Sequence, residues 1–136
     1  MSAGVEACFE DFERELASLP GRYGPPLGRL LLAVRQGPAG NEQSFGCVGL
    51  RQLEDGICEM KRLYIRPAFR GEGAGRALVE AVIAEARAMG FRKIRLDTLP
   101  AMQEAQALYR RLGFLEIPAY LKNPTPHALC FELALR

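Results

Sequence analysis

In RGEGAGRALV, residues 70–79, three glycines stand at alternate positions and run directly into a helical pattern. Glycine loses more backbone entropy on folding than any other residue, so three within five residues indicate conformations or close approaches that only glycine permits. The first N–H groups of a helix lack intrahelical partners, and the helix dipole adds partial positive charge at the same end. Arg70 and Arg76 flank the loop. The stretch therefore predicts an anion site, with a pyrophosphate as the expected anion; a plain tight turn accounts for one such glycine and poorly for three.

The residues on either side of the loop predict a strand before it and a helix after it. Residues 57–65, ICEMKRLYI, are typical of a strand, which Pro67 stops because proline cannot donate to a ladder. From residue 73 or 74 to Met89, apolar residues recur at helical spacing, and Gly90 is a suitable stop. This stripe consists of Leu78, Val79, Val82, Ile83, Ala86 and Met89. Residues 93–98, KIRLDT, predict the strand that completes a right-handed β-α-β crossover.

The remaining patterns place this crossover in a mixed sheet. Residues 5–18 predict a helix, and residues 29–34 and 44–53 predict two strands, the second joined to the third by a tight turn at 54–56. The near-continuous apolar run of 29–34 is typical of a strand covered on both faces. Downstream, the chain predicts a helix and two strands, at 101–112, 114–120 and 128–135. The order α-β-β-β-α-β-α-β-β indicates an α/β fold that is antiparallel at its start.

Three kinds of phosphate loop compete for the glycine stretch. The dinucleotide fingerprint is G-x-G-x-x-G, whereas this chain has G-x-G-x-G and lacks an early parallel β-α-β unit. A P-loop needs G-x-x-x-x-G-K-[ST], which is absent. The third kind is the phosphate loop of acyl-CoA enzymes.

Two stretches carry a resemblance to a known family. YIRPAFRGEGAGRAL, residues 64–78, resembles motif A of the GNAT superfamily of N-acetyltransferases, whose core R/Q-x-x-G-x-G/A is filled by Arg70, Gly73 and Gly75. ALYRRLGF, residues 107–114, resembles motif B of the same family, with its tyrosine at Tyr109. The two motifs occur in order with a helix and a strand between them, and the resemblance covers roughly residues 28–136.

The resemblance implies a fold and a way of binding the co-substrate. It implies a mixed, mostly antiparallel central sheet flanked by helices, in which the family's fourth strand splays from the fifth and acetyl-CoA lies in the cleft. Pantetheine would pair with the backbone of that fourth strand at Leu63, Tyr64 and Ile65. The pyrophosphate would lie against Arg70 and take N–H groups from Gly71, Glu72, Gly73, Ala74, Gly75 and Arg76.

The chemistry of acetyl transfer to an amine indicates two proton-handling residues. An alkyl ammonium has a pKa of about 10.4, so something should accept its proton before attack. Glu59 is the candidate base or water-positioning residue, because strand parity places it on the face of Leu63 and Ile65 and some GNAT enzymes carry a catalytic glutamate there. An exposed strand glutamate is the plain alternative. Tyr109 is the candidate acid for the thiolate; the alternative is an aromatic side chain that packs the helix against the sheet.

Other positions near the cleft follow from the same resemblance. The family often has an asparagine seven residues before the motif B tyrosine, where this chain has Met102. The neighbouring Gln103 is the expected substitute for it, and Thr98 and Leu99 are expected to line the cleft. On the acceptor side, three polar side chains lie in loop-like stretches, Tyr23, Tyr120 and Asn123. Loops often carry specificity, and an ordinary surface loop is the alternative for each.

Composition sets the wider limits. A length of 136 residues fits one domain, 1–136, in which the family's first strand looks shortened or missing. The net charge of +2 gives no argument for nucleic acid, and no apolar run is long enough to span a membrane. Four cysteines with no C-x-x-C spacing and a single histidine, His127, predict buried thiols and no metal site. Without a secretion signal, the cytoplasm is the expected location.

The leading hypothesis is therefore an acetyl-CoA-dependent N-acetyltransferase that acts by direct transfer. The acceptor would be a primary amine of a small molecule, a peptide or a protein, and a homodimer is compatible with this activity. One alternative is a non-catalytic acyl-CoA-binding or sensor module. Another is an interaction domain that uses the closing hairpin as a dimer surface.

Overall fold

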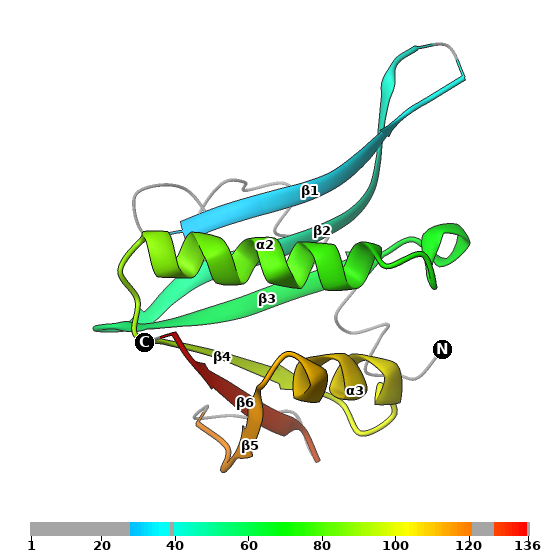
Figure 1. Cartoon of the computed structure of the whole chain (residues 1–136). Helices are drawn as coiled ribbons and strands as arrows, with labels where there is room; N and C mark the ends of the chain where they lie inside the picture. Colours follow the sequence, from blue (N-terminus) through cyan, green and yellow to red (C-terminus); the bar gives the residue numbers. More distant parts are fainter. Residues whose placement is uncertain (1–27, 39, 121–126, 136) are drawn as a thin grey trace.

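A computed structural model describes residues 28–38, 40–120 and 127–135 of the chain. Over these residues, six strands form one mixed sheet in the order β1-β2-β3-β4-β6-β5, accompanied by two α-helices (Figure 1). The strands are β1 (Gly28–Gln36), β2 (Glu42–Glu54), β3 (Ile57–Ile65), β4 (Lys93–Thr98), β5 (Leu115–Ile117) and β6 (Leu129–Ala134). The helices are α2 (Ala74–Ala88), α3 (Gln103–Arg111) and the short 3-10 turn η2 (Pro67–Phe69). The helix expected at 5–18 lies outside the described residues.

The predicted mixed, mostly antiparallel sheet is confirmed, with two differences in the elements. β3 and β4 have the bounds that the sequence predicts, and only the β3–β4 pair is parallel. β5 covers three residues rather than the predicted seven, because Pro118 follows directly and cannot donate to the ladder. The turn η2 was not predicted; its hydrogen bonds run from Phe69 and Arg70 to residues three positions back.

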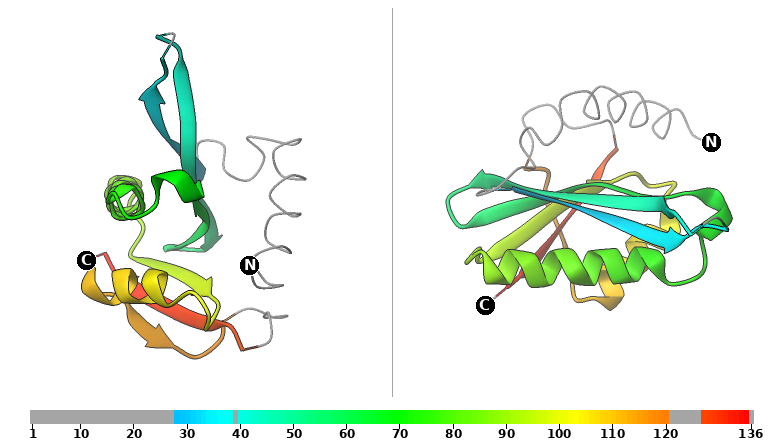
Figure 2. Two further views of the ribbon diagram at one scale, coloured as in Figure 1. Left: turned by 90° about the vertical axis from the view of Figure 1, so that its right-hand side faces the viewer. Right: turned by 90° about the horizontal axis from the view of Figure 1, so that it is seen from above.

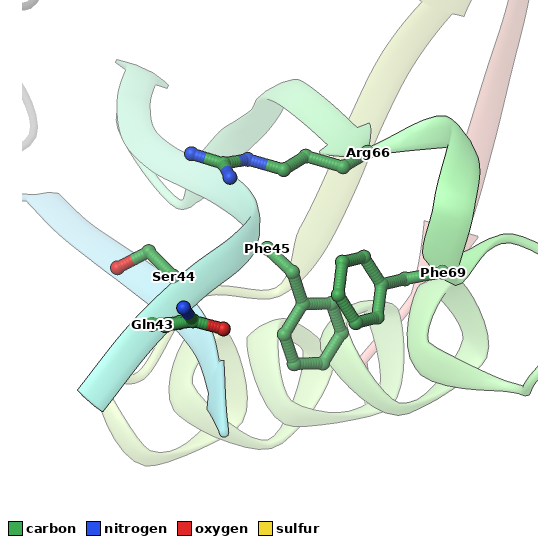
Figure 3. Close-up of a pocket in the computed structure, with 5 residues that line it drawn as sticks. All are labelled: Gln43, Ser44, Phe45, Arg66 and Phe69. Carbon is green, nitrogen blue, oxygen red and sulfur yellow. The ribbon is translucent and has the colours of Figure 1, made fainter. Parts of the chain in front are cut away.

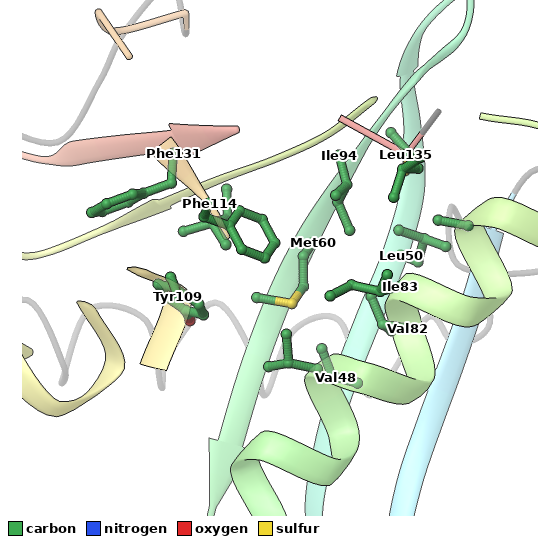
Figure 4. Packing of buried hydrophobic residues seen from close by; sticks show 14 of the residues in the cluster. Val48, Leu50, Met60, Val82, Ile83, Ile94, Tyr109, Phe114, Phe131 and Leu135 are labelled. Carbon is green, nitrogen blue, oxygen red and sulfur yellow. The ribbon is translucent and has the colours of Figure 1, made fainter. Parts of the chain in front are cut away.

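Both helices pack on one face of the sheet (Figure 2). α2 buries Leu78, Val79, Val82, Ile83 and Ala86, which confirms the predicted stripe; Met89 is partly buried. These side chains meet core residues from four strands and from α3, among them Val48, Leu50, Met60, Ile94, Phe131 and Tyr109 (Figure 4). Each fully buried aliphatic or aromatic side chain contributes roughly 1.5–3 kcal/mol, so this single core anchors α2 and the loop before it.

β3 and β4 are paired over only part of their length. The parallel ladder joins Ile57, Cys58 and Glu59 to residues 93–95 and then stops. β3 continues to Ile65 and β4 to Thr98, so beyond Glu59 the two strands diverge and no ladder joins them (Figure 1). Glu59 therefore stands at the point where the sheet opens, on the strand that corresponds to the splayed fourth strand of the expected fold.

A bulge in β3 changes which side chains face the core. Gly49 lies opposite Lys61 and Cys47 opposite Tyr64, so one more residue of β3 than of β2 lies between these two pairs. Before the bulge Met60 faces α2, and after it Leu63 and Ile65 pack against the same core. The predicted sharing of one face by Glu59, Leu63 and Ile65 is wrong, because strict alternation holds only where the ladder is regular.

β1 is an edge strand, and its hairpin with β2 extends beyond the body of the domain (Figure 1). The expectation that 29–34 would be covered on both faces is wrong: the side chains of Leu32 and Val34 are 55% and 45% exposed. A continuous apolar run does not distinguish a central strand from an edge strand. Among the described residues, neither helix has the length and apolar character needed to cross a bilayer.

Candidate active site

The glycine loop adopts a conformation that glycine alone takes up readily. Gly71 and Gly73 have φ angles of +82° and +84°, in the left-handed region. A Cβ built at Gly71, Gly73 or Gly75 meets no atom within 4 Å, so the surface of the loop faces open space. The Arg70 Nε donates to the carbonyl oxygen of Ile65 at 2.9 Å, which closes the turn from β3 into α2. The loop is thus shaped so that a ligand can approach its backbone.

The N-terminus of α2 is open in the same direction. Gly73 is the N-cap, no side chain caps the helix, and its first turn contains no acidic residue. The N–H groups of the first turn therefore keep their donor capacity for an anion, aided by the helix dipole. Arg76, expected as a mobile positive charge, forms an exposed pair with Glu80 at 2.7 Å. Such a pair contributes little stability and can open for a stronger anion.

Glu59 is fully buried and saturated with hydrogen bonds on the sheet face opposite α2. The Nε and Nη2 of Arg51 donate to Glu59 Oε1 at 2.9 and 2.7 Å. The hydroxyl of Tyr120 donates to Glu59 Oε2 at 2.6 Å. The side chain of Glu59 has no exposed surface, so the plain alternative of an exposed strand glutamate is wrong. Removing one partner from such a buried pair is typically costly, about 3–5 kcal/mol, because a charge is left uncompensated.

Further charged pairs surround Glu59 on that face. Lys61 Nζ lies 3.4 Å from Asp97 Oδ1, and this pair joins β3 to β4 beyond their last ladder position. The guanidinium of Arg95 contacts the ring of Tyr120, with 5.5 Å between Cζ and the ring centroid, and also pairs with Glu132 at 2.8 Å. The opening of the sheet is therefore lined by alternating positive and negative groups on the face away from the helices.

Tyr109 lies in α3 on the other face, inside the core. Its ring packs against Phe114 and Phe131, with centroids 5.7 and 6.0 Å apart (Figure 4). Burial, reinforced by the charge of Asp97, raises the pKa of the Tyr109 hydroxyl far above its usual value, so the group stays protonated and able to donate. Among the described residues no hydrogen bond to this hydroxyl is found, and no fully buried side-chain N or O atom lacks a partner.

The residues expected along the end of β4 divide into buried and exposed ones. Thr98 is buried, and its hydroxyl contacts the sulfur of Met102 at 3.7 Å. Gln103 is exposed at the first turn of α3. Sequence reasoning missed Gln106, which is buried and donates to the carbonyls of Leu99 and Pro100 at 2.9 and 3.1 Å. It holds the β4–α3 connection in place, and its position one turn before Tyr109 is the only signal that could have indicated it.

A separate pocket opens beside η2, lined by Gln43, Ser44, Phe45, Arg66 and Phe69 (Figure 3). Phe45 and Phe69 stack with centroids 4.7 Å apart, and Arg35 lies over the Phe69 ring. None of the predicted site residues lines it. Its described lining residues include no carboxylate, imidazole, thiol, amine or phenol that could transfer a proton.

Of the three loop residues predicted on the acceptor side, the structure describes Tyr120, and it also describes the single histidine, His127. Tyr120 follows β5 and reaches Glu59, a residue 61 positions earlier in the chain. No sequence pattern connects residues so far apart. His127 is exposed with a φ angle of +64°. Tyr23 and Asn123 lie outside the described residues.

The buried thiol of Cys58 and the partly buried hydroxyl of Tyr120 predict that the fold loses stability in alkaline solution. Burial raises the pKa of Cys58 to about 12, and burial together with the neighbouring Glu59 raises that of Tyr120 well above its usual value. The unfolded chain ionises these groups near pH 9–10, whereas the folded chain does not, so the unfolded state binds fewer protons. The free energy of unfolding should be flat from pH 6 to 8 and then fall, by about 1.4 kcal/mol per pH unit for each group.

Urea titrations between pH 6 and 10.5 measure how the free energy of unfolding depends on pH. The variant Cys58→Ala is the control, because it removes the contribution of one thiol to the slope that begins near pH 9 and leaves those of Cys130 and of the buried tyrosines. A free energy of unfolding that stays constant up to pH 10.5 would contradict the burial of these groups.

Comparisons with known proteins show which family and which solved structures this chain resembles. The family model described as the acetyltransferase (GNAT) family matches residues 7–114. An uncharacterized N-acetyltransferase of Schizosaccharomyces pombe is 35% identical over 133 residues, which cover 97% of this chain and 79% of that relative. A solved structure from Klebsiella pneumoniae, described as an acyl-CoA N-acyltransferase, has a TM-score of 0.74 at 30% identity and covers 100% of this chain and 92% of its own.

A further solved structure concerns the co-substrate. It is a GNAT family acetyltransferase from Elizabethkingia anophelis with acetyl-CoA bound. It has a TM-score of 0.67 at 19% identity and covers 92% of this chain and 82% of its own. At that identity the likeness shows a shared fold.

Proposed function

This chain belongs to the GNAT family of acetyltransferases and is an N-acetyltransferase, and we propose that it transfers the acetyl group of acetyl-CoA directly to a primary amine. The acceptor is an amine of a small molecule, a peptide or a protein. The observation that carries the proposal is the combination of an open glycine loop at the N-terminus of α2 with strands that diverge beyond Glu59. The open loop suits a pyrophosphate, and the diverging strands leave room for pantetheine beside the backbone of β3.

The loop would hold the phosphates through backbone donors. The Cβ positions of Gly71, Gly73 and Gly75 face open space, and two left-handed glycines would let the loop backbone approach an anion closely. The guanidinium of Arg70 supports this shape by its bond to Ile65 and adds positive charge. The loop residues Glu72 and Ala74 contribute through their backbone alone, so their side chains carry no specificity in this proposal.

The diverging strands would take the remainder of the co-substrate. The parallel ladder between β3 and β4 ends at Glu59, and the backbone of the following part of β3, at Leu63, Tyr64 and Ile65, would pair with the amides of pantetheine. Thr98 at the end of β4 and the exposed Gln103 at the start of α3 lie on the other side of this opening. Acetyl-CoA supplies an activated thioester there, so no protein nucleophile is needed.

Two residues would handle protons on opposite faces of the sheet. Tyr109 is protonated at neutral pH and would donate that proton to the departing thiolate. Glu59 is the proposed proton acceptor for the amine. Because Arg51 and Tyr120 already occupy both of its carboxylate oxygens, it acts at the end of a hydrogen-bond network rather than by direct contact with the acceptor. A cytoplasmic location and a homodimer stay predictions.

Calorimetric titration of the chain with acetyl-CoA, CoA, NAD and ATP tests the co-substrate. We expect low-micromolar binding of acetyl-CoA and CoA, because both carry the pyrophosphate and pantetheine, and no binding of the other two. Thiol release from acetyl-CoA in the presence of a panel of primary amines then tests the transfer. Absence of acetyl-CoA binding would overturn the proposed function.

A further inference from the structure

We propose that Tyr120 is a catalytic residue that relays the proton of the acceptor amine to the buried carboxylate of Glu59. This inference rests on the proposed function, and it names the path by which a sealed group can serve as a base. It arises from one contact, the 2.6 Å hydrogen bond from the Tyr120 hydroxyl to Glu59 Oε2.

The burial of Glu59 makes an intermediary necessary. Its side chain is wholly buried, so an acceptor amine in the opening of the sheet does not reach it directly. Among the described residues, two groups contact the carboxylate and could pass a proton to it. These groups are the guanidinium of Arg51, on Oε1, and the hydroxyl of Tyr120, on Oε2.

Only one of these two partners can pass a proton on. A guanidinium has donors but no acceptor and does not deprotonate in proteins, so Arg51 can orient Glu59 but cannot relay. A phenol is both donor and acceptor: while its proton points at Glu59, its lone pairs remain available to an incoming N–H. Tyr120 is partly exposed, whereas Glu59 is not. Within the part of the chain that the structure describes, Tyr120 is therefore the group through which a proton can enter the network.

The position of Tyr120 fits an acceptor in the opening between β3 and β4. Glu59 is the last ladder residue of β3 before the strands diverge. The charged and titratable groups that act on Tyr120 come from three strands, and they are Glu59 on β3, Arg95 and Asp97 on β4, and Cys130 on β6. Behind them, Arg51 on β2 pairs with Glu59. Asp97 is a second carboxylate close enough to act on Tyr120, and it is paired with Lys61 on β3.

The proposed step balances as follows. The acceptor ammonium gives a proton to the Tyr120 oxygen while the phenolic proton of Tyr120 moves to Glu59 Oε2, so Tyr120 is never left as a phenolate. Burial and the adjacent carboxylate raise the pKa of Tyr120, which makes such a coupled transfer preferable to a free phenolate. The neutral amine attacks the thioester carbonyl carbon, a C–N bond forms, and the C–S bond breaks with its electron pair on sulfur. The second amine proton ends on that sulfur by way of Tyr109, and Glu59 returns its proton to solvent through Tyr120.

The test is the pH dependence of the variant Tyr120→Phe. Acetyl-CoA is the donor, n-butylamine, benzylamine and glycine methyl ester are the acceptor probes, and thiol release is the readout. Without the relay only the neutral fraction of the amine reacts, and this fraction rises tenfold per pH unit below the ordinary pKa of the amine. With benzylamine as the acceptor, we expect kcat/KM of the variant to be lower by about a hundredfold at pH 7. The deficit should shrink to a few-fold near pH 9, with acetyl-CoA affinity unchanged.

Two results would overturn the relay. A deficit that stays constant between pH 6.5 and 9 would show that Tyr120 acts only by holding the fold. The double variant Tyr120→Phe/Glu59→Gln also distinguishes a proton relay from a purely structural role. In Tyr120→Phe the carboxylate of Glu59 loses one hydrogen-bond donor, and the double variant removes that carboxylate. The relay predicts that the double variant is no more active than the worse single variant. Recovery of activity would show that the unpaired carboxylate was the only defect.

The failure of the relay and the failure of the proposed function are distinguishable. If the natural sequence releases thiol with these amines and Tyr120→Phe does so equally well at pH 7, the relay is wrong and the acetyltransferase stands. If the natural sequence binds no acetyl-CoA, or releases no thiol with any probe, amine acetylation fails and the relay fails with it.

Discussion

Gly73→Val should lower the affinity for acetyl-CoA by at least about a hundredfold, which corresponds to roughly 2.7 kcal/mol of binding free energy. Gly73 has a φ angle of +84°, which a β-branched residue adopts only with strain of about 1–3 kcal/mol. Its Cβ position is open space, which is where the proposed pyrophosphate would lie. Valine would both distort the N-cap of α2 and occupy that space. Calorimetric titration with acetyl-CoA measures the loss.

Variants at two further glycines distinguish the effect of backbone strain from the effect of filling the proposed phosphate space. Gly40 has a φ angle of +79° and an equally open Cβ position, in the turn between β1 and β2. Gly40→Val should therefore cost similar stability and leave acetyl-CoA binding intact. Gly75 lies within α2 without a left-handed backbone, so Gly75→Val adds bulk at the loop with little strain. It should weaken binding while the fold stays stable. Unchanged affinity in Gly73→Val would remove the phosphate assignment.

Tyr109→Phe should lower kcat by about a hundredfold or more while the dissociation constant of acetyl-CoA stays within about twofold. General acid catalysis typically contributes between 10²- and 10⁴-fold, and the substitution removes only the hydroxyl. The ring contacts with Phe114 and Phe131 remain, and no hydrogen bond of this hydroxyl is found among the described residues. The fold should therefore be kept. Steady-state kinetics with acetyl-CoA and the best amine of the panel measures the change.

A packing control supports the interpretation of that variant. Phe114→Leu removes the ring–ring contact with Tyr109 but leaves the Tyr109 hydroxyl in place. It should therefore lower thermal stability with a small effect on kcat. The opposite pattern, full turnover in Tyr109→Phe and low turnover in Phe114→Leu, would mean that Tyr109 serves only the core.

Local signals in the sequence were sufficient for the elements that carry the loop. Alternating glycines before an amphipathic pattern predicted the turn and α2, and Pro67 and Gly90 marked the neighbouring boundaries. These features depend on residues within one or two helical turns of each other, through steric limits, missing donors and periodicity. The motifs at 64–78 and 107–114 then indicated the family, which the comparisons confirmed.

The arrangement of the polar site depended on pairing between distant segments. The bulge in β3 arises from its register with β2, and it reversed the predicted face of Leu63 and Ile65 relative to Glu59. The edge position of β1 likewise depends on strand order, which the apolar run of 29–34 does not encode.

The site residues show the same division. The sequence alone was enough to name Glu59 and Tyr109 as candidates and to predict an anion loop at residues 70–76, because Tyr109 and the loop belong to short motifs and Glu59 lies on the strand that leads into one of them. Only the folded chain brings Arg51 and Tyr120 to the two oxygens of Glu59, since one contact needs the β2–β3 ladder and the other spans 61 residues. Burying a carboxylate requires partners from wherever the sheet supplies them, and the sheet is assembled by long-range pairing that no local pattern specifies.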